Sequence, residues 1–294
     1  MKINRKESHS LYHQFFMGLV QLRTSNEKNL FYIACHKCQS RHQRYLRAYR
    51  KKTFVVFSNK NVFKIVWQES AELMEREFSL NEYVFSSKNS IWSSHATIYS
   101  KIFEFSKITI ASTSRLPQNA SKDQIDTFAK YLLESIPLEV SYQVWWKTLD
   151  QDRLERMWKV LGDPYSKLIM SFLAHVKLPV TGAHGDFIDQ NILLNHEKVV
   201  QIIDWEYWRP QGSVVTDLLR LYSIRHARNM KISEFSSNIF NEFDLPHYFI
   251  KYTNLSVKIL SILAAITNVC LPATIGPTEK RASILLSSLK DFFE

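Results

Sequence analysis

The segment that most constrains the fold of this chain is residues 180–218, in which an irregular loop and two short apolar runs follow a region of helical pattern. It contains a His-Gly-Asp triplet that ends at Asp186, then Asn191 five residues later, and Asp204 at the end of an apolar run. Side chains at this spacing, on a loop and at the end of a neighbouring strand, can point into one cleft. Their oxygens suit Mg²⁺, which prefers carboxylate and carbonyl ligands together with substrate phosphates. The spacing favours phosphoryl transfer, which needs charge neutralisation, aligned reactants and an acceptor for the hydroxyl proton.

The region before this segment has a β-rich pattern. Residues 53–67 predict a β-hairpin, because two runs of β-forming residues flank the turn at 58–61. Residues 97–112 predict a second strand pair, and residues 70–85 predict a helix with its apolar side chains on one face. The polar stretch 112–122 is typical of a linker. The sequence therefore predicts a small sheet with one helix, followed by a hinge.

The region after the linker is mainly helical. Residues 121–138 and 141–178 have apolar side chains at three- and four-residue spacing, and the helical pattern returns from Ser213 to the C-terminus. Two short strands, Ile192–Leu194 and Val199–Ile203, lie between these helical regions.

These patterns predict an α+β chain of two lobes. Residues 1–115 would form a small β-rich N-terminal lobe and residues 116–294 a larger helical lobe. The chain is long enough for two modest cores, with 294 residues of which 45% are hydrophobic. Its 13% aromatic content and its lack of repeated or biased tracts exclude a disordered or low-complexity chain.

The run H-G-D-x4-N-I-L-L, followed by I-I-D-W-E, resembles the aminoglycoside phosphotransferase and choline kinase superfamily. The combined motif is specific because a catalytic loop, a strand pair and a metal-binding aspartate occur in the family's order. The resemblance implies a two-lobed protein-kinase-like fold, with a small antiparallel β-sheet lobe and a larger, mainly helical lobe.

The resemblance also implies a role for each polar residue of the segment. Asp186 would be the catalytic base that orients the substrate hydroxyl and accepts its proton. Asn191 and Asp204 would hold Mg²⁺. His184 would brace the loop by hydrogen bonds, and Asp217 would anchor the same loop from below. The alternative is that these residues only cap turns and start a strand.

A kinase-like fold further implies a lysine on the third strand that pairs with a glutamate of the following helix. Lys64 lies in an otherwise apolar strand, where a lysine needs a partner or a route to water. Glu77 shares the apolar helix face of Leu73 and Met74. We therefore expect Lys64 to pair with Glu77 at the nucleotide site, with an outward-facing Lys64 as the alternative.

The chain departs from the broader kinase pattern because it has no glycine between Gly18 and Gly162. A glycine-rich phosphate loop is therefore absent. Its expected place, just before the strand at Thr53, holds Arg50, Lys51 and Lys52. Basic side chains there could contact the nucleotide phosphates. Because of this departure, the alternative remains that the chain is a catalytically inactive, kinase-like protein that binds nucleotide or acts as a scaffold.

The net charge of +10 is concentrated at one end of the chain. Residues 1–64 contain 14 Lys and Arg but only two acidic residues, and the run 36–52 contains seven Lys and Arg with no acid. That run is a nucleic-acid or anionic-polymer patch, a solvated face, or a contact to nucleotide phosphates. A nucleic-acid partner is the least favoured of these, since no recognised binding module surrounds the run.

Cysteine content and hydropathy restrict the location of the protein. Three cysteines cannot form a disulfide framework for a chain of this length. No apolar run reaches the ~20 residues that span a bilayer. We therefore expect a cytoplasmic protein without a membrane span.

Together these features predict a phosphotransferase that uses ATP or GTP with Mg²⁺. It would move the γ-phosphoryl group to a hydroxyl of a small acceptor, such as an aminoglycoside, an amino alcohol or a sugar. A protein acceptor is less favoured, because the activation-loop signatures Asp-Phe-Gly and Ala-Pro-Glu are absent after Asp204.

Overall fold

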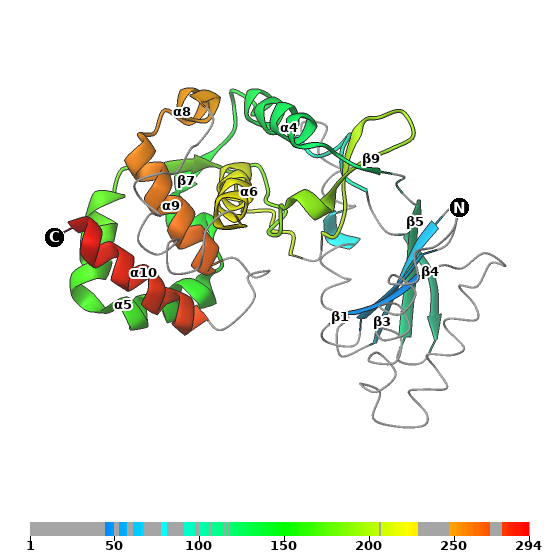
Figure 1. The fold of residues 1–294 in the computed structure, drawn as a ribbon, viewed down its shortest axis with the longest axis horizontal. Coiled ribbons are helices and arrows are strands. Elements are labelled where there is room, and N and C mark those ends of the chain that lie inside the picture. The colour runs from blue at the N-terminus through cyan, green and yellow to red at the C-terminus, as the bar shows by residue number, and fades with distance from the viewer. Residues whose placement is uncertain are drawn as a thin grey trace. The chain divides into compact units, whose positions relative to one another are not determined.

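A computed structural model describes 191 of the 294 residues, in the ranges 45–49, 53–57, 61–67, 78–80, 91–97, 100–105, 108–114, 116, 118–205, 207–228, 247–270 and 278–293. The chain divides into two compact units. The first unit contains residues 1–82 and 97–117, and the second contains residues 83–96 and 118–294. Figure 1 shows both units and labels those helices and strands for which there is room.

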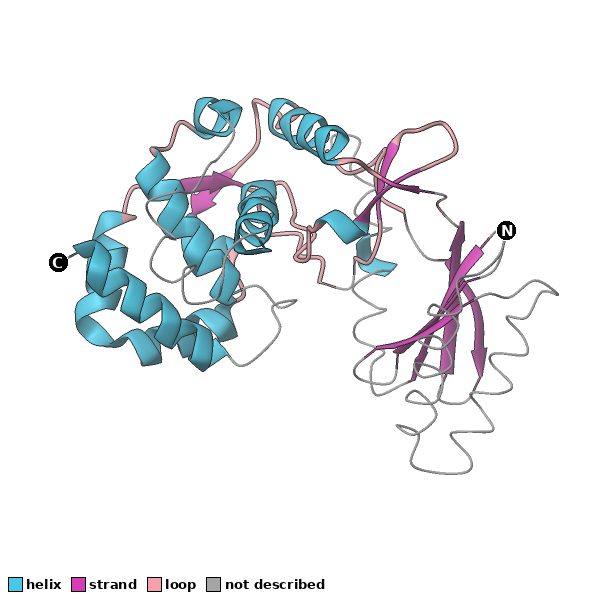
Figure 2. Ribbon diagram, viewed as in Figure 1, coloured by secondary structure: helices cyan, strands magenta, loops and turns pink. Residues whose placement is uncertain are grey.

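The first unit is built on a five-stranded antiparallel sheet in the order β1-β2-β3-β5-β4 (Figure 2). The strands are β1 (Tyr45–Tyr49), β2 (Thr53–Phe57), β3 (Asn61–Trp67), β4 (Ser100–Phe105) and β5 (Ile108–Ser114). The hairpin predicted at 53–67 is confirmed by the pairing of β2 with β3, and the strand pair predicted at 97–112 by that of β4 with β5. Of the helix predicted at 70–85, the structure describes only the helical residues 78–80.

One face of β3 carries the small core of this unit. Val62, Val66 and Ala111 are buried together, and Phe78 packs against them. Lys64 lies between the two valines on the same face of the strand, since side chains two residues apart point the same way. It is only 2% exposed, so the alternative of an outward-facing Lys64 is wrong.

The second unit is mainly helical. Its helices are α4 (Lys122–Glu134), α5 (Gln151–Phe172), α6 (Val214–Arg228), α8 (His247–Thr253), α9 (Val257–Cys270) and α10 (Thr278–Phe293). Its short strands are β6 (Gln118–Asn119), β7 (Tyr142–Val144), β8 (Lys177–Pro179), β9 (Ile192–Leu194) and β10 (Val200–Ile202). The predicted strand pair at 192–203 is confirmed by the antiparallel pairing of β9 with β10.

Two predictions for this part of the chain are wrong in detail. Residues 141–178 are not helical throughout, because β7 and β8 pair across the two ends of α5. Helix α5 is itself kinked at Gly162, whose φ is 73°. The stretch 112–122 is not simply a linker, since β5 continues to Ser114 and β6 pairs with β9. In each case a pairing between distant residues overrides the local pattern.

Local sequence explains where α4 begins and which face it buries. Ser121 and Gln124 form a capping box, in which each side chain accepts a hydrogen bond from the other residue's backbone N–H. The buried side chains of the helix recur at three- and four-residue spacing and are Ile125, Phe128, Ala129, Leu132 and Leu133. Elsewhere in the second unit, α10 and α9 pack against α5, and α6 packs against α9.

The segment 91–96 packs with the second unit although it precedes β4 in the sequence. Trp92 is fully buried, and its indole N–H donates to the Thr181 carbonyl at 3.2 Å. The Ile202 N–H donates to the His95 carbonyl at 2.7 Å. These contacts fix the strand that leads to Asp204. Within the parts of the chain described here, no helix is both long enough and apolar enough to cross a membrane.

Candidate active site

The His-Gly-Asp loop requires glycine at two positions. Gly182 and Gly185 have φ values of 75° and 82°, in the left-handed region that side chains disfavour. A Cβ atom on Gly185 would lie 2.4 Å from the Tyr207 carbonyl oxygen, and one on Gly182 would lie 2.0 Å from the Trp208 ring. The loop therefore passes close to residues 207–208, where only glycine fits.

Asp217 fixes this loop from helix α6. Its carboxylate is fully buried and accepts hydrogen bonds from the backbone N–H groups of His184 (2.6 Å) and Gly185 (2.9 Å). Burial raises the pKa of this carboxyl, while the two N–H donors and the charge of Arg209 act in the opposite direction. The contacts are those expected of an anchor for the loop.

His184 links the loop to the strand that ends before Asp204. Its Nε2 lies 2.8 Å from the Ile203 carbonyl oxygen, and its Nδ1 lies 3.1 Å from the Asp186 backbone nitrogen. Because a carbonyl accepts and an N–H donates, this pair of contacts specifies a neutral imidazole with its proton on Nε2. The ring is buried against Trp205, with 4.5 Å between ring centroids.

Asn191 joins Asp186 to the strand that carries Asp204. Its side-chain Nδ2 donates to the Asp186 carbonyl at 2.9 Å and lies 3.4 Å from Asp186 Oδ2. Its backbone carbonyl accepts the N–H of Ile203 at 3.0 Å. The next residue, Asp204, has a φ of 66°, which is uncommon for a residue other than glycine. The predicted positions 184, 186, 191 and 204 thus belong to one hydrogen-bonded loop and strand system.

The donor set around Asn191 fits a magnesium ion. The amide nitrogen of Asn191 is used toward Asp186, so its oxygen Oδ1 is the atom left to face a cation. Asp204 supplies a carboxylate after the adjoining strand. Two protein oxygen donors are sufficient for Mg²⁺, which keeps waters and substrate phosphates as its other ligands. In the described part of the chain, His, Cys, Asp and Glu form no group of three suited to a metal.

Arg220 is a site residue that the sequence analysis did not identify. Its Nη2 and Nε lie 2.7 and 3.2 Å from Asp186 Oδ1, and the two side chains are 7% and 17% exposed. Arg220 is three residues after Asp217 on α6, so both can face the loop. An arginine one turn after the anchoring aspartate is the signal that could have revealed it.

A second arginine of α6 ties the same loop to α4. Arg225 contacts Asp189, with Nε 2.8 Å from Oδ1, and also forms an ion pair with Asp126. Tyr222 donates its hydroxyl to Asp126 as well, at 3.2 Å. Helix α6 therefore holds the turn that runs from Asp186 to Asn191 at two of its residues, Asp186 and Asp189.

The expected nucleotide-site residues lie in the first unit. Lys64 is buried on β3, as described above. Its expected partner Glu77 and the basic residues Arg50, Lys51 and Lys52 lie outside the described residues. Their predicted contacts therefore stay predictions.

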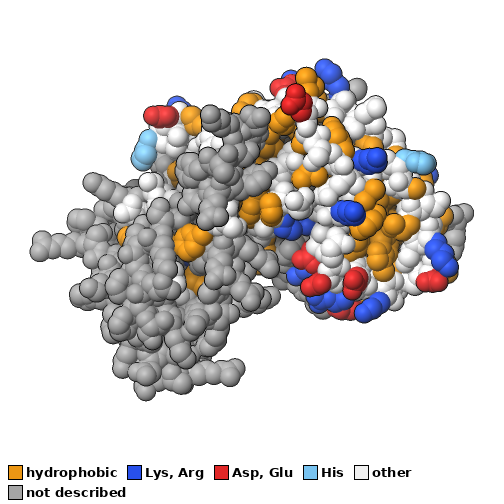
Figure 3. All heavy atoms as spheres, turned by 180° about the vertical axis from the view of Figure 1, so that it is seen from behind, with side chains coloured by type: hydrophobic (Ala, Val, Ile, Leu, Met, Phe, Trp, Pro, Cys, Tyr) orange, Lys and Arg blue, Asp and Glu red, His pale blue; other side chains and the backbone are white. Residues whose placement is uncertain are grey.

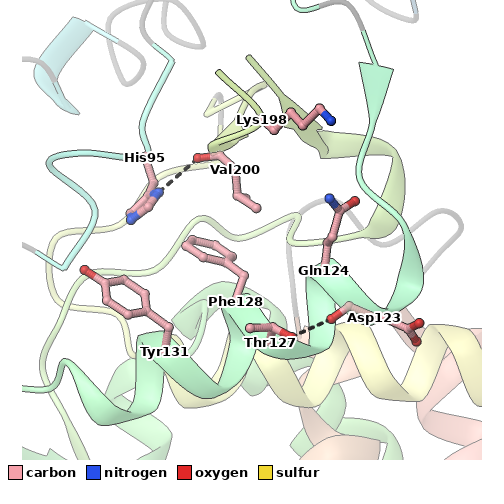
Figure 4. A pocket seen from close by; sticks show the side chains of 8 residues that line it. All are labelled: His95, Asp123, Gln124, Thr127, Phe128, Tyr131, Lys198 and Val200. Carbon is pink, nitrogen blue, oxygen red and sulfur yellow. Dashed lines mark hydrogen bonds between the residues drawn. The ribbon is translucent and has the colours of Figure 1, made fainter. Parts of the chain in front are cut away.

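A cavity of about 600 Å³ lies away from the His-Gly-Asp loop. Figure 4 shows its lining by α4, by His95 and by the hairpin of β9 and β10. The rings of His95, Phe128 and Tyr131 pack against one another there, with 4.7 Å between the His95 and Phe128 centroids. None of the candidate site residues lines this cavity, so its size is no argument about the chemistry of the loop.

Comparison with known proteins supports the resemblance to phosphotransferases that the sequence indicates. Residues 109–234 match the model of the phosphotransferase enzyme family. A search of curated proteins gives no significant match. Choline kinase LicA from Streptococcus pneumoniae is similar in structure, with a TM-score of 0.52 at 12% identity over 89% of this chain and 98% of that chain.

Two further solved structures resemble the chain. A putative fructosamine-3-kinase from Haemophilus somnus 129PT has a TM-score of 0.51 at 11% identity, over 86% of this chain and 92% of that one. An aminoglycoside 2'-phosphotransferase-IIIa mutant in its GDP complex has a TM-score of 0.50 at 15% identity, over 90% and 98%. At these identities the likeness shows the two-lobed, protein-kinase-like fold. The predicted resemblance to phosphotransferases is thus confirmed for residues 109–234, which match the family model, whereas the solved structures show the fold alone.

Proposed function

We propose that the protein is a phosphotransferase that uses ATP or GTP with Mg²⁺ and phosphorylates a hydroxyl of a small acceptor. The observation that carries the proposal is the construction around Asp186. Asp217 fixes the backbone before it, Asn191 fixes the backbone after it, and Arg220 holds one of its carboxylate oxygens. Such a held carboxylate suits the proton acceptor of a phosphoryl transfer.

The two oxygens of Asp186 have different surroundings. Oδ1 accepts from Arg220, whereas Oδ2, among the residues that the structure describes, has the 3.4 Å contact to Asn191 Nδ2. In the proposed reaction the acceptor hydroxyl donates its hydrogen bond to Oδ2. The hydroxyl oxygen forms a bond to the γ-phosphorus while the bond from that phosphorus to the β-γ bridging oxygen breaks. The proton passes to Asp186, and the nucleoside diphosphate leaves.

The remaining residues bind the nucleotide and its metal in this proposal. Asn191 and Asp204 hold Mg²⁺, which when bound neutralises charge on the phosphates. Lys64 pairs with Glu77 and reaches the phosphates, since a buried lysine needs a negative partner. Arg50, Lys51 and Lys52 contact the phosphates where a glycine-rich loop would otherwise lie.

The proposal assigns one task to each lobe. Residues 1–115 bind the nucleotide, and residues 116–294 provide the catalytic loop and the acceptor site. The fold alone does not choose among an aminoglycoside, an amino alcohol and a sugar as acceptor. The missing glycine-rich loop favours one alternative, a catalytically inactive kinase-like nucleotide-binding or scaffold protein.

The test is transfer of labelled γ-phosphate from ATP or GTP to a panel of small hydroxyl compounds and to water. Asp186→Asn removes the proton acceptor but keeps the shape, so the rate should fall about 10²- to 10⁴-fold. Asp163→Asn, at an exposed carboxylate of α5, is the matched control and should leave the rate unchanged. No transfer above background in either the wild type or Asp186→Asn would instead support the inactive or scaffold protein, and equal measurable rates would show that Asp186 is not the proton acceptor.

A further inference from the structure

The cavity between α4, His95 and the hairpin of β9 and β10 takes no part in the proposed phosphoryl transfer. Its volume of about 600 Å³ lies within the range of about 300–1,000 Å³ that is usual for small-molecule pockets. Figure 3 shows hydrophobic side chains at several places on the described surface of the second unit, so a single exposed ring there is no evidence of a site. The cavity differs because its lining residues converge from three segments of that unit.

Two walls of the cavity, the segment 91–97 and the hairpin, are joined by hydrogen bonds. His95 Nδ1 lies 2.9 Å from the Val200 carbonyl oxygen, and Gln201 Nε2 donates to the Ser94 carbonyl at 3.0 Å. The Ile202 N–H donates to the His95 carbonyl, as described above. The cavity is therefore formed by the fold itself, which is the usual property of a small-molecule site.

One end of the cavity is aromatic. Tyr131 stacks on Phe128 with 6.0 Å between ring centroids and 22° between ring planes, and the His95 ring meets both rings edge to face. Phe128 is buried, whereas Tyr131 is 44% exposed, so part of the tyrosine ring is open to a ligand. Aromatic rings stabilise one another in offset or edge-to-face arrangements at 4.5–7 Å. A planar ring can extend this cluster.

His95 adds no charge to the aromatic end at neutral pH. Because the Val200 carbonyl accepts a hydrogen bond, His95 Nδ1 carries the proton and Nε2 is an acceptor. Burial lowers the pKa of His95, and the hydrogen bond to Val200 opposes that change only in part. The aromatic end therefore suits an uncharged ring.

The opposite end of the cavity is polar. Figure 4 shows Lys198 of the hairpin turn and Gln124 of α4 at this end, apart from the three rings. Within the described part of the chain, the Lys198 ammonium makes no hydrogen bond or ion pair. Gln124 Oε1 accepts the Ser121 N–H at 2.9 Å, so its Nε2 is left as a donor. A charged and a neutral donor thus lie where an anion can bind.

The acidic residue of the lining does not neutralise the polar end. Figure 4 shows the Asp123 carboxylate turned away from Lys198 and from the rings. The backbone carbonyl of Asp123, and not its carboxylate, accepts the Thr127 hydroxyl at 2.8 Å. The neighbouring Glu197 is not among the residues that line the cavity. The first turn of α4 also contributes the positive end of the helix dipole, so the polar end remains positive.

We propose that this cavity binds a small aromatic carboxylate, with its ring against Tyr131 and its carboxylate against Lys198 and Gln124. The rings favour a planar apolar body, and the two donors favour an anion. Because the rings and the donors lie at opposite ends, they also set the orientation of the ligand. The inference does not rest on the proposed phosphotransferase function, since none of the candidate catalytic, metal or nucleotide residues lines the cavity.

The first test varies one property of the ligand at a time, by ligand-detected NMR titration of the full chain at pH 7.5. Indole-3-acetate is compared with indole-3-acetamide and tryptamine, which keep the ring and change the charge. Phenylacetate is compared with cyclohexylacetate, which keeps the charge and loses the aromatic ring.

We expect indole-3-acetate to bind about fivefold or more tightly than its amide and than tryptamine, and phenylacetate to bind more tightly than cyclohexylacetate. Ligands of this size should bind at concentrations up to about 10 mM. No binding of indole-3-acetate or phenylacetate in that range would overturn the inference. Equal affinity for tryptamine or for cyclohexylacetate would do the same.

The second test removes the positive charge. Lys198→Gln should weaken indole-3-acetate about fivefold and leave indole-3-acetamide nearly unchanged, whereas Lys198→Arg should keep most of the affinity. Lys159→Gln, at an exposed lysine of α5, is the matched control and should change neither affinity. An equal loss for acid and amide in Lys198→Gln, or no loss for the acid, would contradict the proposed orientation.

The third test fills or opens the cavity from α4. Thr127→Trp places a ring in the cavity and should abolish binding of every probe, and urea unfolding checks that the variant is folded. Tyr131→Ala should weaken the aromatic probes, whereas Tyr142→Ala, at an exposed tyrosine of β7, is its control. Unchanged binding in a folded Thr127→Trp protein would place the probes elsewhere and overturn the inference.

A last measurement separates this site from the proposed nucleotide site. Indole-3-acetate should bind Asp186→Asn and Asp204→Ala as it binds the wild type, and MgATP should not displace it. This result would hold even if no transfer of phosphate were detected. Displacement by MgATP, or loss of binding in Asp204→Ala, would assign the probe to the nucleotide site and contradict the inference.

Discussion

Asp217 would touch no substrate, but it fixes the backbone of the loop that contains the candidate catalytic residue. Its two carboxylate oxygens accept the backbone N–H groups of His184 and Gly185, and all of these groups are buried. Asp217→Ala leaves two buried donors unsatisfied, at about 1–3 kcal/mol each. We expect the free energy of unfolding to fall by at least about 2 kcal/mol in urea titrations.

The control for this prediction is Asp163→Ala. Asp163 forms an exposed ion pair with Lys167, four residues later on α5. Surface pairs of this kind contribute about 0–1 kcal/mol. Equal losses of stability in Asp217→Ala and Asp163→Ala would show that Asp217 does not anchor the loop.

His95 makes the stability of the second unit depend on pH. Burial lowers its pKa below the usual value of 6.5, against the opposing hydrogen bond from Nδ1 to the Val200 carbonyl. A group with a lowered folded-state pKa contributes stability above its unfolded pKa and loses that contribution as the pH falls. Stability should therefore decrease between about pH 7.5 and pH 5.5, through this histidine.

The measurement compares wild type with His95→Phe by urea unfolding at both pH values. Phenylalanine keeps an aromatic ring beside Phe128, where the two rings pack edge to face, but it cannot take up a proton. We expect a smaller loss of stability on acidification in the variant. The same loss in both proteins would assign the pH dependence to other groups.

The residues of the site differ in how well the sequence predicts them. Asp186, Asn191 and Asp204 could be chosen because their types and spacing form a recognisable motif, and the structure places them on one hydrogen-bonded loop and strand. Arg220 could not be chosen in this way. Its pairing with Asp186 depends on the rotation of α6 relative to the loop, and that rotation is set by packing over a separation of 34 residues.

At the scale of elements, the His-Gly-Asp loop depends on the close approach of residues 207–208. Gly185→Ala places a Cβ atom 2.4 Å from the Tyr207 carbonyl oxygen, in addition to the strain of a positive φ. Gly162→Ala is a matched control, since its φ is also positive but its new Cβ atom would meet nothing closer than 4.0 Å.

We expect Gly162→Ala to cost about 1–3 kcal/mol from backbone strain alone. Gly185→Ala should cost more and should also reduce phosphoryl transfer, because the loop must move. The measurements are urea unfolding and the labelled-phosphate assay. A variant Gly185→Ala with the stability and rate of Gly162→Ala would mean that the loop tolerates the shift.

Elements formed by neighbouring residues were predictable from the sequence. The hairpin of β2 and β3 and that of β9 and β10 each have a short turn between two β-forming runs. The pairing of β7 with β8 was not predictable, because α5 separates the two strands. Three-residue strands have too little periodicity to be recognised without their partners, so β7 and the first two residues of β8 fall within the helical pattern predicted for 141–178.

At the scale of the whole molecule, the change from a β-rich to a helical pattern correctly indicated a two-lobed chain. The order in which the chain passes between the two units could not be predicted from the sequence. The segment 83–96 belongs to the second compact unit although both of its neighbours in sequence belong to the first. Trp92 shows the reason, since its indole is buried against Phe187 and Trp205 of the loop and strand that carry the site. Local patterns do not contain such long-range contacts.

The most direct test of the account is the thermal stability of the purified protein with and without MgATP and MgGTP, beside Asp204→Ala. A ligand that binds only the folded state raises the apparent stability by mass action. We predict a Mg²⁺-dependent rise with at least one of the two nucleotides and its loss in Asp204→Ala. No rise with either nucleotide at saturating concentration, or an equal rise in Asp204→Ala, would contradict a metal-dependent nucleotide site.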